Sequence, residues 1–154
     1  MNKDLELDKD FVNDIRPLIE KGILSVNSTD NEKYLIALIE SNFSFLGSKI
    51  EDKYKYSSLE SSDLAKLSDK QVADIVQNHI IKEGKTFNFL DKAFGIIGDN
   101  YMKYSYMGVL KEIIPHILIF ISLPQHTYFA SDDGQFVFCH TFENDFIFYK
   151  AILS

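Results

Sequence analysis

The residues best suited to chemistry lie in the final segment of this 154-residue chain, from His126 onwards. His126 and His140 could face each other across a hairpin, with Glu143 and Asp145 close by. Imidazole nitrogens and carboxylate oxygens are ligands that zinc and iron take in proteins. One possible function is therefore a small metal-dependent hydrolase. The spacing of His140 and Glu143 argues against it, because residues three apart on a strand point to opposite faces.

Other nucleophiles and acids in this segment fit structural roles better than catalysis. Cys139 precedes His140, but neighbours on a strand point apart and cannot form a thiolate–imidazole pair. Asp132 and Asp133 are adjacent in an expected turn, whereas acid–base catalysis would need one of them buried. The sequence therefore predicts a protein that is not an enzyme and that carries no metal or cofactor.

Aromatic residues crowd the same segment, and its charged residues are almost all acidic. From Glu112 to the end the chain has five carboxylates and one cation, Lys150. At interfaces, aromatic rings supply anchoring area, while carboxylates steer association and pair with Lys or Arg. We therefore predict a surface for a basic protein partner, with four acids and two tyrosine anchors: Asp132, Asp133, Glu143, Asp145, Tyr128 and Tyr149.

The overall charge excludes several other partners. The chain has 23 acidic and 16 basic residues, and its formal net charge is −7. Its only arginine is Arg16, so the basic patch that nucleic acids or anionic membranes require is not expected. A single cysteine excludes an internal disulfide and fits a reducing compartment. The polar N-terminus is not a signal peptide, so we expect a cytoplasmic protein without a membrane partner.

A three-stranded meander is expected to position these residues. Asp133 and Gly134 predict a tight hairpin turn, and the residues from Glu143 to Asp145 predict a second turn. Between them, Phe136 and Phe138 alternate with residues of the opposite face, such as Val137. Apolar residues on both faces predict a sheet that helices cover on one side and that stays partly exposed on the other.

Helical spacing and capping signals predict about five helices before the meander. They are expected from Asp8 or Asp10 to Gly22, over 31–47, after a capping box at 68–71, over 89–97 and over 101–118. Pro17 is expected to end the first helix early or to start a second one. Residues 48–67 read as a polar loop, with a short helix as the alternative. The run 116–123 fits either a helix or a buried strand.

Together these elements predict one α+β domain over 1–154, a length sufficient for a real core. About five N-terminal and central helices, over about 8–118, would pack on a C-terminal antiparallel β-meander of three or four strands, over about 119–153.

The chain resembles bacterial immunity proteins of polymorphic-toxin and contact-dependent growth inhibition systems. The resemblance lies in its size, its acidity, its single arginine, its lack of a catalytic motif and its carboxylate-bearing aromatic sheet from Tyr128 to Tyr149. It implies a one-to-one complex that blocks a basic toxin domain, often a nuclease. The expected function is thus non-enzymatic toxin inhibition. The alternatives are a hydrolase at His126 and His140, and a structural subunit that self-associates through an exposed aromatic face.

Overall fold

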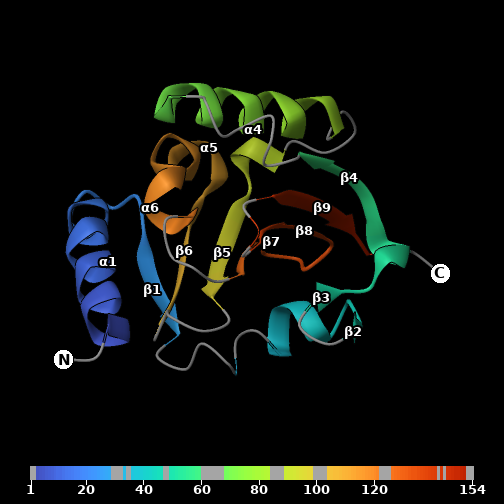
Figure 1. The fold of residues 1–154 in the computed structure, drawn as a ribbon, viewed down its shortest axis with the longest axis horizontal. Helices are drawn as coiled ribbons and strands as arrows, with labels where there is room; N and C mark the ends of the chain where they lie inside the picture. Colours follow the sequence, from blue (N-terminus) through green and yellow to red (C-terminus); the bar gives the residue numbers. More distant parts are fainter. Residues whose placement is uncertain are drawn as a thin grey trace.

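A computed structural model describes residues 3–28, 33, 36–46, 49–59, 68–83, 89–98, 104–121, 126–141, 143 and 145–151. Within these residues, seven strands form one antiparallel sheet in the order β1-β6-β5-β7-β8-β9-β4 (Figure 1). The strands are β1 Ser25–Ser28, β4 Lys55–Leu59, β5 Ala93–Gly98, β6 Ser105–Val109, β7 Thr127–Ser131, β8 Phe136–His140 and β9 Phe146–Lys150. A second, two-stranded sheet pairs β2 Phe45–Leu46 with β3 Lys49–Ile50.

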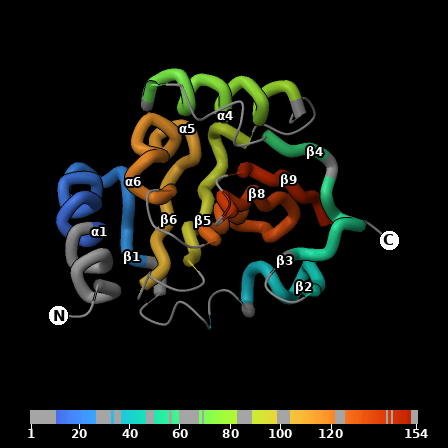
Figure 2. The backbone as a smooth tube through the Cα atoms, in the orientation of Figure 1, coloured from blue at the N-terminus to red at the C-terminus, as the bar shows by residue number. Residues whose placement is uncertain are grey.

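Helical segments are interspersed among the strands along the chain. The α-helices of the described residues are α1 Lys3–Glu20, α4 Asp69–Glu83, α5 Leu110–Ile113 and α6 Ile117–Ile121. Shorter helical turns are the π-helix η1 Ile36–Glu40 and the 3-10 turns η2 Asp52–Tyr54, η3 Phe89–Asp91 and η4 Ile114–His116. The chain path places β4 beside β9, although many residues separate them in the sequence (Figure 2).

The predicted arrangement of five N-terminal and central helices on a small C-terminal meander is wrong. The meander supplies β7, β8 and β9, but the other four strands of the large sheet lie within 8–118, the part expected to be helical. The helices do not precede the sheet as a block. Local sequence patterns predicted helices where the structure has strands, because tertiary pairing decides whether a short apolar segment becomes a strand.

Strand β5 shows this most clearly, since 89–97 was predicted to be a helix. The segment instead makes the turn η3 and then a central strand between β6 and β7. Five of the six residues of β5 are buried, so both faces are apolar and period-two alternation is missing. The helix predicted over 101–118 fails in the same way at β6, and the chain becomes helical only from Leu110.

Two other segments before α4 also differ from the prediction. Within 31–47, the described residues Lys33 and Ile36–Glu40 are helical as predicted, but Phe45–Leu46 is a strand. The predicted loop over 48–67 contains β3, η2 and β4. Strand β4 is polar because it lies at an edge of the sheet, where strong β-propensity is not required. Gly47, the end of the helix predicted over 31–47, and residues 101–103, the start of the helix predicted over 101–118, lie outside the described residues.

Two helix-end predictions are confirmed. The Ser68 amide donates to Oε1 of Gln71 at 2.9 Å, and the Gln71 amide donates to Oγ of Ser68 at 3.3 Å, which is the predicted capping box. Gly22, with φ of 78°, follows the end of α1. Pro17, however, does not end α1, which continues to Glu20.

The large sheet separates two hydrophobic clusters. The first cluster packs residues of α1, α4, α5 and α6 against one face, which carries Phe129, Phe136, Phe138, Phe146 and Phe148. The second cluster packs residues of η1 and β3 against the other face, which carries Ile97, Tyr128, Val137, Cys139 and Tyr149. The predicted alternation of the meander is therefore confirmed. Its second face is covered, because the segment around η1 and the small sheet packs on it.

Candidate functional site

The β7–β8 turn presents two of the predicted carboxylates, Asp132 and Asp133. The Gly134 amide donates to the Ser131 carbonyl at 2.8 Å, so the two aspartates are the central residues of the turn. Gly134 follows with φ of 71°, a conformation that glycine adopts without strain. The Asp132 amide donates to the Ala93 carbonyl at 3.0 Å. The turn is therefore fixed to the sheet, with both aspartates exposed.

Three donors hold the carboxylate of Asp133. Oδ1 accepts from the Ser131 hydroxyl at 2.6 Å and from the Gln135 amide at 3.0 Å. Oδ2 accepts from Nζ of Lys92 at 2.8 Å. Partial burial works to raise the pKa of Asp133, but the hydrogen bonds outweigh it and lower the pKa to about 2. Asp133 is thus ionised and already paired with a cation.

The structure brings further cations to the same end of the sheet. Nζ of Lys111 lies 2.9 Å from Oδ1 of Asp91, and the Leu110 amide donates to the Lys92 carbonyl. Lys150 stands opposite Phe136 at the start of β8. The excess of acids counted along the final segment is therefore partly balanced in space by lysines from other segments.

Glu143 and Asp145 lie in the β8–β9 turn, at the opposite end of β8. The five residues of β8 separate the two turns by about 17 Å, at about 3.4 Å per residue. The Thr141 amide donates to the Asp145 carbonyl at 2.8 Å, and the Asp145 amide donates to Oγ1 of Thr141 at 3.2 Å. The four predicted carboxylates thus form two groups at opposite ends of the meander.

The two predicted aromatic anchors are inside the protein. Tyr128 is 2% exposed and Tyr149 is 3% exposed, and both belong to the second cluster. Burial, helped by nearby Cys139 and Asp52, raises the pKa of Tyr149 above its usual value. The rings of these tyrosines therefore stabilise the core and are not available to a partner in this conformation.

His126 and His140, the histidines of the hydrolase alternative, do not face each other across the hairpin as expected. His140 pairs with Thr127 across β7 and β8, which places His126 one residue out of register. Both imidazoles are buried, and His140 packs edge-on against Phe146 with ring centroids 5.0 Å apart. Among the residues that the structure describes, no group of three or more His, Cys, Asp or Glu side chains could hold a metal ion.

Two polar contacts were not found from the sequence. Oγ of Ser57 lies 2.7 Å from Nε2 of His79, which joins β4 to α4. On the other side of the sheet, the Ser44 hydroxyl donates to Glu51 and lies 3.2 Å from the Tyr54 hydroxyl. The contact with Ser44 lowers the pKa of both Glu51 and Tyr54. Both contacts involve 48–59, which the sequence did not place in the fold.

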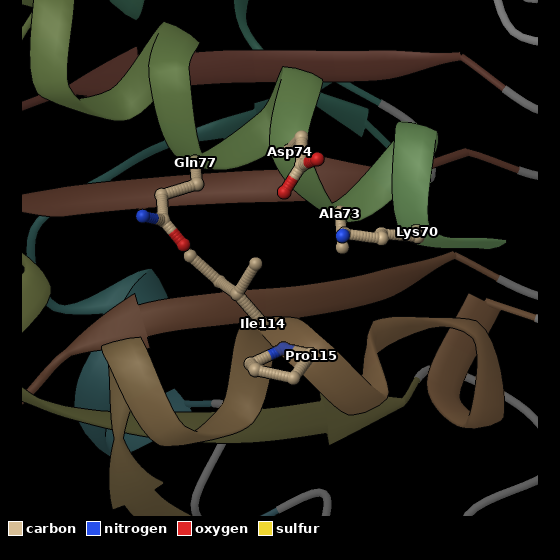
Figure 3. A pocket seen from close by; sticks show the side chains of 6 residues that line it. All are labelled: Lys70, Ala73, Asp74, Gln77, Ile114 and Pro115. Atoms are coloured by element: carbon tan, nitrogen blue, oxygen red, sulfur yellow. The ribbon is translucent and has the colours of Figure 1, made fainter.

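A groove of about 440 Å³ runs between α4 and η4 (Figure 3). Its lining residues come from α4 and from the turn η4: Lys70, Ala73, Asp74, Gln77, Ile114 and Pro115. Ala73 and Ile114 are buried and form an apolar floor. No local pattern in the sequence indicated this groove, because α4 and η4 meet only in the tertiary structure.

Comparison with known protein families, curated proteins and solved structures finds no match to the chain. Within the described residues, no helix combines the length and the apolar character that crossing a bilayer requires. The case for a function therefore depends on the charge, the turns and the groove.

Proposed function

We propose that this chain is a non-enzymatic immunity protein, which binds and neutralises a basic protein toxin domain in the cytoplasm. A nuclease is the favoured toxin class, because a domain that acts on nucleic acid needs a basic surface. The net charge of −7 supports the proposal, since opposite charges speed association and disfavour wrong partners. The same charge makes direct binding of nucleic acid by this chain unfavourable.

The observation that carries the proposal is the preformed β7–β8 turn. Its backbone is fixed by Gly134 and by the Ala93 carbonyl, and it holds Asp132 in solvent beside the Asp133–Lys92 pair. A carboxylate on a rigid turn can meet a cation without the ordering cost of a flexible loop. The proposed interface therefore centres on this turn, and it does not include the buried tyrosines or the distant β8–β9 turn.

Co-expression tests the proposed function. The toxin candidate is to be sought beside the gene for this chain, as the C-terminal domain of a large secreted protein. We expect cells that express this domain to regain growth when the chain is co-expressed, and the purified proteins to form a one-to-one complex by light scattering. Failure to restore growth, together with two separate masses in solution, would reject the proposal.

A further inference from the structure

The groove between α4 and η4 combines an apolar floor with polar groups on one wall. Ala73 and Ile114 form the floor, and Pro115 is exposed on the wall opposite α4. Figure 3 shows Asp74 and Gln77 projecting from α4 toward the Ile114 side of the groove. The volume of about 440 Å³ lies in the range of pockets that take small ligands, so the groove has room for a side chain.

Asp74 and Gln77 present acceptors to this space. They are three residues apart on α4, so they are neighbours on one helix face. In the part of the chain that the structure describes, no salt bridge joins Asp74 to a cation within 4.0 Å. A carboxylate and an amide oxygen above an apolar floor provide the two kinds of contact that an arginine side chain requires.

Arginine fits this wall better than an anion does. Its methylene stem can lie on the floor, and its planar guanidinium has five donors that can reach two acceptors at once. An anion would need Lys70 and the free amides at the start of α4. The capping box already uses the Gln71 amide, and the Val72 amide donates to the Ser68 carbonyl at 3.0 Å.

We propose that the groove between α4 and η4 binds an arginine side chain of the protein partner. This inference deepens the proposed function and depends on it for the source of the arginine. Asp74 and Gln77 accept hydrogen bonds from the guanidinium, and the stem lies against the exposed ring of Pro115, above the buried Ala73 and Ile114. Lys70, at the start of the groove, repels the same cation and so weakens the site. The groove is a second contact region, separate from the β7–β8 turn.

An NMR titration with the isolated chain tests the site without the partner. The probe is N-acetyl-L-arginine amide, and N-acetyl-L-lysine amide and N-acetyl-L-aspartate amide are the matched alternatives. We expect saturable, millimolar shifts of the backbone amides of 73–77 and 114–116 with the arginine probe. The lysine probe should bind several-fold more weakly because it lacks the planar fork. The aspartate probe should give no saturable shift there.

Two charge-changing variants should act in opposite directions. Asp74→Asn should weaken arginine binding by about threefold to fivefold, and Lys70→Met should tighten it by about twofold, as the strength of exposed ion pairs predicts. The matched controls are Asp14→Asn on α1 and Lys82→Met at the end of α4, both exposed and outside the groove. Neither control should change the dissociation constant.

Three results would overturn the inference. They are the absence of saturable shifts at the groove, binding of the aspartate probe there, and weaker arginine binding in Lys70→Met. Because the titration uses no partner, it separates the two proposals. A groove that binds arginine in a chain that forms no toxin complex would reject the proposed function alone. A toxin complex that Asp74→Asn and Asp14→Asn weaken equally would reject the groove alone.

Discussion

The hydroxyl of Ser57 lies 2.7 Å from Nε2 of His79 because strand β4 is irregular. Lys55 pairs with Tyr149, whose ring lies in the second cluster, whereas Ser57 pairs with Phe148, whose ring lies on the helical face. The register shift between them turns Ser57 toward α4. The His79 ring also packs on Phe148, with centroids 4.3 Å apart. The contact between Ser57 and His79 thus helps to attach an edge strand to a helix.

A double-mutant cycle should detect this contact. We expect Ser57→Ala to destabilise the protein by about 1 kcal/mol, as loss of a half-buried hydrogen bond does. In a His79→Phe background the same change should cost much less, because its partner is already gone. Urea unfolding of the four proteins gives the coupling energy. Simple additivity of the two changes would show that the contact contributes nothing to stability.

The Asp133–Lys92 pair should make the free energy of unfolding depend on pH in the acidic range. The pKa of Asp133 is about 2 in the folded protein against a usual 3.8, so its ionised form favours folding. This contribution is complete above the usual pKa and is lost as the pH falls from about 4 through about 2. We expect Asp133→Asn to cost about 1 kcal/mol at pH 7, a discounted value because the side chain is 43% exposed.

Urea unfolding at several pH values measures this loss. The difference between the parent and Asp133→Asn should shrink toward zero as the pH approaches 2, and a difference that stays constant would contradict the assignment. A second variant, Lys92→Met, removes the nearest cation. In that variant the pKa of Asp133, followed by NMR, should rise toward its usual value.

Gly134 should tolerate a side chain less well than Gly22. Both have positive φ, at 71° and 78°, so alanine brings similar backbone strain of about 1–2 kcal/mol at each. At Gly134 the new Cβ would also lie 2.9 Å from the Leu38 carbonyl oxygen and against the Asn42 amide, while at Gly22 it would meet nothing within 4 Å. Gly134→Ala should therefore lower the free energy of unfolding by at least about 1 kcal/mol more than Gly22→Ala does, as measured by thermal or urea unfolding. Equal losses would mean that η1 does not pack on the turn.

The tyrosines should behave as core residues. Tyr149→Ala should lower the free energy of unfolding by about 3–5 kcal/mol, because it leaves a cavity in the second cluster. Tyr149→Phe should retain most of the stability and leave partner binding unchanged. A stable Tyr149→Ala protein that has lost only partner binding would instead restore Tyr149 as an interface anchor.

The sequence predicted the parts of the fold that depend on local pattern. The faces of β8 follow from strict alternation of Phe136 and Phe138 with Val137 and Cys139, and the start of α4 follows from the Ser68–Gln71 box. Strand β5 could not be predicted, because burial on both faces removes the alternation that identifies a strand.

The candidate site was harder to predict than the fold. The positions of Asp132 and Asp133 in a turn follow from local sequence. The pairing of Asp133 with a cation does not, because Lys92 is 41 positions away from Asp133. Counting charges along the final segment therefore overstated the negative charge at this end of the sheet. The tyrosines were misplaced because the sequence gives no sign that η1 and the small sheet cover the second face.

The most direct test of the central claim is the rate at which the toxin domain associates with the chain at several salt concentrations. We expect the association rate to fall steeply as salt rises, and Asp132→Asn to lower both the rate and its salt dependence by several-fold relative to Asp14→Asn. Replacing Glu143 and Asp145 by their amides should have the smaller effect, because they lie at the other end of β8. An association rate that does not change with salt concentration would contradict a basic partner. Equal association rates for Asp132→Asn and Asp14→Asn would contradict docking at the β7–β8 turn.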